Sequence, residues 1–161
     1  KFWTTANSSV CSLFHLFNKI SAQDSSYTTF DKADLDSVLN SGIITFGATT
    51  IKAEQANDTD ISKAIRNNLK KNILAGADIS TGNIAACVMV VNNKLMDEVP
   101  QEALEHGFGQ LNRLLAKDNT IHRGIYISNK PGIAVYTVIG GLKPAEGWFD
   151  FGEWVPREYT R

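Results

Sequence analysis

The sequence TTFDKADLDSVL, residues 28–39, places three carboxylates within six residues at the start of a short amphipathic pattern. Carboxylates this close repel one another, so a positive or catalytic group should compensate Asp31, Asp34 and Asp36. A helix N-terminus is one such group: Asp31 can cap it by accepting backbone N–H bonds, and Asp34 lies in the first turn, where the helix dipole favours negative charge. Alternatively, the acids face outward and act on a substrate bound elsewhere. The remainder of the chain has to distinguish these two interpretations.

The segment before the acidic stretch has the pattern of a long helix. From about residue 6 to residue 22, apolar side chains recur every three or four positions, a spacing that predicts one helix face. They are Val10, Leu13, Phe14, Phe17 and Ile20. Polar residues 21–29 end this pattern before the acidic stretch. The chain starts without a methionine and enters the helical pattern almost at once, so we expect a fragment of a longer protein.

Strand-like and helix-like patterns alternate after the acidic stretch. The expected strands are residues 43–47, 83–92, 121–128 and 132–142, and the expected helices are 58–75 and 100–115. The second strand is almost continuously apolar, which predicts a central strand covered on both faces. The turn Asn129-Lys-Pro-Gly predicts that the last two strands form a hairpin. Together these patterns predict an α+β fold, in which one long leading helix approaches a four-stranded mixed sheet packed with two helices.

This order divides the chain into three parts. Residues 1–27 form the leading helix and its loop, residues 28–142 form the α+β domain with the acidic loop at 28–36, and residues 143–161 form a tail. The tail is rich in aromatic side chains: Trp148, Phe149, Phe151, Trp154 and Tyr159. We expect it either to pack onto the sheet of its own domain or to bind a protein partner.

Composition excludes several classes of function. The 161 residues are 43% hydrophobic and 20% charged with a formal net charge of −1, so the basic excess that usually grips a nucleic-acid backbone is absent. No apolar run approaches the roughly 20 residues of a membrane span, and the first residues do not resemble a signal peptide. Cys11 and Cys87 lie in apolar runs, which predicts buried thiols in a reducing compartment. We therefore expect a cytoplasmic protein with no nucleic-acid partner and no membrane span.

Motifs that would bind a nucleotide or a metal within this chain are absent. The sequence has no GxxxxGK[ST], GxGxxG or GxSxG pattern. His15, His106 and His122 have neither HExxH spacing nor cysteine partners, so no metal site is expected. His122 lies within an expected strand and is interpreted as a structural histidine.

The order of elements and the run Thr29-Phe-Asp-Lys-Ala-Asp-Leu35 resemble the C-terminal half of the tubulin/FtsZ family. In that family a central helix leads into a loop with the pattern Asn-x-Asp-x-x-Asp. Further similarities are Phe46-Gly47, the glycine-alanine and apolar run within residues 75–91, and the last strand within residues 133–141. The resemblance covers about residues 6–142.

The resemblance implies a site and a partner for the acidic stretch. In the family, two aspartates of this loop reach the nucleotide of the next subunit when subunits stack head to tail, and they activate GTP hydrolysis there. Carried over, Asp31 and Asp34 are the catalytic acids and Thr29 is the supporting polar residue. Ser9 and Asn7 occupy the positions expected on the guanine side.

The resemblance also implies partners that lie outside this sequence. GTP is bound mainly by an N-terminal GTP-binding half that this chain lacks, and Mg is a further candidate cofactor there. The parent protein is then a prokaryotic filament-forming GTPase, in cell division or a related process, whereas this chain alone is not expected to hydrolyse GTP. Two alternatives stay open: a non-enzymatic interaction or ligand-binding domain whose acids only cap a helix, and a family member that polymerises without hydrolysis.

Overall fold

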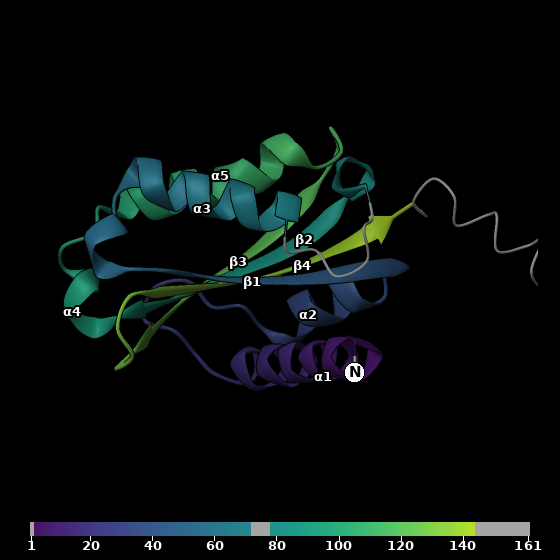
Figure 1. Ribbon diagram of the computed structural model, residues 1–161, viewed down its shortest axis with the longest axis horizontal. Coiled ribbons are helices and arrows are strands. Elements are labelled where there is room, and N and C mark those ends of the chain that lie inside the picture. Colours follow the sequence, from purple (N-terminus) through teal and green to yellow (C-terminus); the bar gives the residue numbers. More distant parts are fainter. Residues whose placement is uncertain (1, 72–77, 144–161) are drawn as a thin grey trace, which may run out of the picture.

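The protein folds as a sheet covered by helices on both faces (Figure 1). The computed structural model describes residues 2–71 and 78–143, and only the backbone of residues 2–10 and 71. The helices are α1 (Phe2–Ser21), α2 (Lys32–Leu39), α3 (Asp58–Lys71), α4 (Asn93–Met96) and α5 (Gln101–Leu114). The strands are β1 (Ile43–Ile51), β2 (Ile84–Asn92), β3 (Thr120–Ser128) and β4 (Ile133–Leu142), with short 3₁₀ turns at Ala53–Gln55 and Ile79–Thr81.

The sheet has four strands in the order β1-β4-β2-β3. The strand β4 runs antiparallel to both β1 and β2, whereas β3 runs parallel to β2, so the sheet is mixed as the sequence predicts. The almost continuously apolar strand β2 lies inside the sheet, and its residues from Ala85 to Met89 are buried. This confirms the α+β fold and the central position of β2.

The predicted hairpin between the last two strands is wrong. The turn after β3 does reverse the chain, and Gly132 has the positive φ of 78° that glycine tolerates. However, β2 lies between β3 and β4, and Val91 of β2 is paired with Ile127 on one side and with Ile133 on the other. A short turn fixes the reversal of the chain but not the strand partner. Because β4 is buried along most of its length, it gains more from an interior position than from the edge beside β3.

Two hydrophobic layers hold the sheet. On one face, α3 and α5 pack through a core that contains Ile65, Leu104 and Phe108. On the other face, α1 and α2 pack through a second core around Phe17 and Phe30 (Figure 1). The leading helix is therefore a structural layer of the domain, in addition to the predicted pair of helices. It carries the acidic loop directly onto the sheet.

The two cysteines have different environments. Cys87 is buried in β2, and burial raises the pKa of its thiol to about 12, so it stays protonated as a small core side chain. Cys11 is exposed on α1, so the prediction that it is buried is wrong. Within the described ranges, no helix is long and apolar enough to cross a bilayer. The expectations for the aromatic tail concern residues 144–161, which lie outside the described part of the chain.

Candidate functional site

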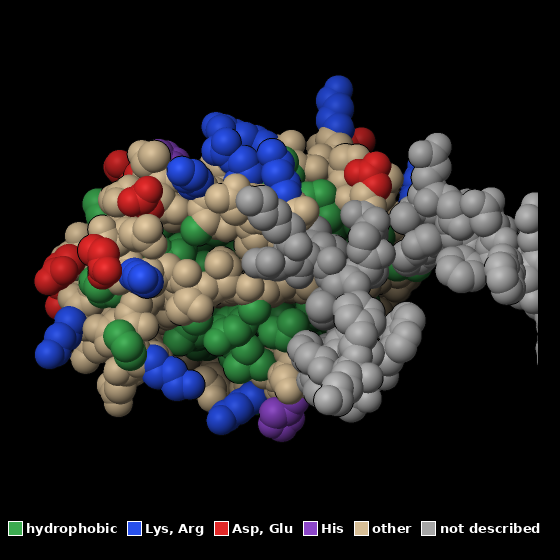
Figure 2. Space-filling view, in the orientation of Figure 1, with side chains coloured by type: hydrophobic (Ala, Val, Ile, Leu, Met, Phe, Trp, Pro, Cys, Tyr) green, Lys and Arg blue, Asp and Glu red, His purple; other side chains and the backbone are tan. Residues whose placement is uncertain are grey.

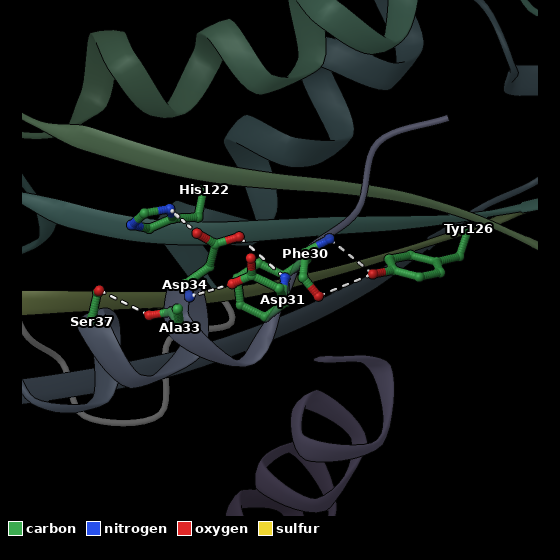
Figure 3. A network of polar contacts seen from close by, with 7 residues as sticks. All are labelled: Phe30, Asp31, Ala33, Asp34, Ser37, His122 and Tyr126. Atoms are coloured by element: carbon green, nitrogen blue, oxygen red, sulfur yellow. Dashed lines mark hydrogen bonds and ion pairs between the residues drawn. The ribbon is translucent and has the colours of Figure 1, made fainter. Parts of the chain in front are cut away.

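The acidic stretch forms a capping box at the start of α2 (Figure 3). The backbone N–H of Asp34 donates to Asp31 Oδ1 at 2.8 Å, and the backbone N–H of Asp31 donates to Asp34 Oδ2 at 3.1 Å. Asp31 has the extended backbone of an N-cap residue, and Asp34 is the third residue of the helix. The interpretation of these acids as caps is therefore correct. The box also fixes where both carboxylates lie on the surface.

His122 makes a further contact with this pair. Its Nδ1 lies 3.0 Å from Asp34 Oδ1, with 22% of the histidine side chain and 28% of the aspartate side chain exposed. Since the carboxylate accepts, the imidazole donates from Nδ1. The sequence identified His122 only as a structural histidine in a strand. No spacing pattern could reveal this contact, because the two residues come from β3 and α2 and meet only when α2 packs on the sheet (Figure 3).

Tyr126 anchors the loop that carries the acids to β3. Its hydroxyl accepts a hydrogen bond from the backbone N–H of Phe30 at 2.9 Å and donates to the carbonyl of Phe30 at 3.1 Å. Nearby, the backbone N–H of Ile125 donates to the carbonyl of Thr28 at 2.8 Å. Burial raises the pKa of Tyr126, so the phenol stays neutral and remains a donor. The loop is therefore attached to the edge strand at consecutive positions, directly before the first catalytic candidate.

Replacement of Tyr126 by phenylalanine should test this anchor. The buried N–H of Phe30 would lose its acceptor, so we expect the free energy of unfolding to fall by about 1–3 kcal/mol. Chemical denaturation of the chain measures this value. Tyr136→Phe is the matched control, because no hydrogen bond of its hydroxyl is found within the described residues, and its stability should change by less than about 0.5 kcal/mol. Equal effects of both replacements would show that the hydroxyl of Tyr126 does not anchor the loop.

The other predicted site residues lie in different surroundings. Thr29 is exposed, and its Oγ1 accepts from the backbone N–H of Ser25 at 3.1 Å, so its hydroxyl helps to close the loop. Asn7 and Ser9 lie in α1, but their side chains are outside the described part of the structure. The structure thus brings Asp31 and Asp34 together, places Thr29 beside them, and adds His122 and Tyr126.

The two carboxylates can serve another molecule. Asp31 is exposed, and in the contacts of the described residues it uses only Oδ1. Over the described ranges, the structure has no group of three or more histidine, cysteine or acidic side chains that could hold a metal ion. Two carboxylates in fixed positions at the surface can accept hydrogen bonds from a water molecule or help to hold a cation supplied by a partner.

A long helix that leads into an acidic loop on this mixed sheet defines a class of protein, the tubulin/FtsZ-type C-terminal domain. The family model described as "Tubulin/FtsZ-like protein TubZ-like, C-terminal domain" matches residues 17–143. The chain belongs to this family. No curated protein matches the sequence.

Solved structures share the fold. One is described as the structure of the type III plasmid segregation protein TubZ, with a TM-score of 0.76, 18% identity, and coverage of 92% of this chain and 39% of that one. A GTPγS-form protofilament of Bacillus thuringiensis serovar israelensis TubZ gives a TM-score of 0.78 at 17% identity, covering 95% and 39%. An empty FtsZ dimer from M. jannaschii gives 0.59 at 18% identity, covering 75% and 33%. The chain thus spans about two-fifths of the length of these TubZ relatives, with 39% covered in each.

Proposed function

We propose that this chain is the half of a filament-forming GTPase that activates GTP hydrolysis on the adjacent subunit. The observation that carries the proposal is the fixed pair Asp31 and Asp34, held at the surface by the capping box and by His122. Residues 1–27 would link this half to an N-terminal GTP-binding half, and residues 28–36 would be the catalytic loop. GTP, with Mg, would be held mainly by that other half.

The chemistry of the site supports this division of labour. The carboxylates of Asp31 and Asp34 provide hydrogen-bond acceptors. Such acceptors can orient an attacking water or help to hold a cation near a phosphate. Two like charges close together do not attract a phosphate by themselves, so the nucleotide has to be held by other groups. A site completed only at the junction of two subunits would tie hydrolysis to filament growth.

The relatives suggest a cellular role. One TubZ is described as a type III plasmid segregation protein, and another was solved as a GTPγS-form protofilament. Because the matched family model is the TubZ-like one, we propose that the parent protein acts in plasmid segregation. Its filament partners would be copies of the same protein stacked head to tail.

A second candidate function is a domain whose acids only cap α2, in a protein that assembles without hydrolysis or acts as a non-enzymatic interaction or ligand-binding module. The complete capping box favours it, because each acid already has a structural task. Thr29, which closes the loop through Ser25, is compatible with both functions.

The dependence of turnover on protein concentration distinguishes these candidates. We expect the GTPase activity per molecule of the full-length parent to rise with concentration as subunits assemble, since the loop would act on a neighbour. This chain alone should release no phosphate from GTP. Phosphate release measured together with sedimentation gives both quantities. Turnover per molecule that stays constant across the assembly threshold, or measurable turnover by this chain alone, would contradict the proposal.

A further inference from the structure

Asp34 is held on both carboxylate oxygens by donors from two separate elements. The backbone N–H of Asp31 donates to Oδ2 at 3.1 Å, and the imidazole Nδ1 of His122 donates to Oδ1 at 3.0 Å (Figure 3). One hydrogen bond leaves a carboxylate free to rotate about its side-chain bonds. Two donors on opposite oxygens fix both the rotamer and the plane of the group. His122 therefore helps to fix the orientation of the Asp34 carboxylate at the surface.

The strand that carries His122 is itself fixed. His122 is paired with Ala86 across β2 and β3, and Tyr126, on the same face of β3, binds the backbone of Phe30. The histidine thus lies on a rigid sheet, whereas α2 is a helix of only eight residues. A contact from the sheet to the third residue of α2 sets the position of the acid relative to the whole domain.

We propose that His122 is a positioning residue for Asp34, and that GTP turnover in the assembled parent protein depends on the contact between them. This inference rests on the proposed function, because Asp34 has to be an active acid. The imidazole donates from Nδ1 and orients the carboxylate, whose remaining lone pairs stay available to water or a cation.

Three variants of the full-length parent test the proposal, with GTP turnover measured per assembled subunit. His122→Ala removes the donor, so turnover should fall about tenfold at neutral pH with GTP binding unchanged. His122→Asn places an amide nitrogen near the position of Nδ1, so most turnover should be retained. Asp34→Ala reports whether the acid itself is active. Sedimentation and thermal unfolding of each variant separate assembly and folding from chemistry, and His122→Asn carries the test if His122→Ala is unstable.

The chain offers a matched control in a second histidine–aspartate contact. His106 Nδ1 lies 2.6 Å from Asp58 Oδ2 between α5 and α3, with side chains 60% and 52% exposed, so His106→Ala should leave turnover unchanged. Normal turnover in His122→Ala together with slow turnover in Asp34→Ala would overturn the positioning role and leave the proposed function intact. Equal loss in His122→Ala and His122→Asn would also overturn it, as would normal turnover in Asp34→Ala alone. Normal turnover in both Asp34→Ala and Asp31→Ala would overturn the proposed function itself.

Discussion

Alanine at Asp31 or Asp34 in the full-length parent is expected to slow GTP turnover by about 10² or more, with GTP binding unchanged. Each replacement removes a carboxylate that the structure holds at the surface in a fixed position, whereas the nucleotide would be bound by the other half of the protein. Turnover per assembled subunit and the affinity for a fluorescent GTP analogue measure the two effects. A loss confined to turnover identifies groups that act on the reaction.

Two further variants separate catalysis from capping. Asp36→Ala is the control for charge, since this third acid of the stretch is exposed on the same helix and takes no part in the capping box. Asp31→Asn keeps an oxygen acceptor at the N-cap, so it should preserve stability while lowering turnover, whereas Asp31→Ala should also cost about 0.5–2 kcal/mol of stability. Normal turnover in both Asp31→Ala and Asp34→Ala would leave helix capping as the role of these acids.

Phe30→Ala should lower the free energy of unfolding of the chain by about 3–5 kcal/mol, the usual cost of removing a buried aromatic ring. The side chain of Phe30 is fully buried, and its ring packs edge-on against Phe17 with centroids 6.0 Å apart. A Cβ at Gly124 would lie 2.8 Å from the Cβ of Phe30, so β3 leaves room for this side chain. The residue directly precedes Asp31, so its loss should loosen the acidic loop as well as the core. Urea denaturation followed by circular dichroism measures the change.

Phe14→Ala provides the comparison for this prediction. Phe14 lies on α1 like Phe17 but is 44% exposed in this chain, so its replacement should cost well under half as much stability. A loss in Phe30→Ala no larger than that expected for the exposed Phe14 would show that the core beneath the loop does not depend on Phe30. Figure 2 shows that hydrophobic side chains also gather on the surface between β1 and α1, on the same face of the sheet as this core.

Much of the fold could be predicted from local sequence patterns. The three- and four-residue spacing of apolar side chains located α1, α3 and α5, because a helix buries one face. The continuous apolar run located β2 inside the sheet, because both faces of such a strand need cover. The acids before α2 predicted the N-cap at Asp31, since a cap is a contact between neighbours in the chain. The short helix α4 and the extension of β1 to Ile51 were not predicted.

Contacts between distant elements were beyond local patterns. The turn after β3 suggested a hairpin, yet β4 lies between β1 and β2 because an apolar strand is buried better inside the sheet than at its edge. The sequence predicted a structural role for His122 but not its contact with Asp34, because the two side chains meet only when α2 packs on the sheet.

The sequence by itself determined the helices α1, α2, α3 and α5, the central strand and the position of two acids at a helix start, because each depends on residues a few positions apart. Tertiary structure alone decided the order of the strands, the packing of α1 on the sheet, and the contacts of His122 with Asp34 and of Tyr126 with Phe30. These contacts join segments that are remote in the chain, and the free energy of burying both faces of the sheet selects which segments meet. The local sequence places the acids in the loop before α2, and the fold sets their orientation.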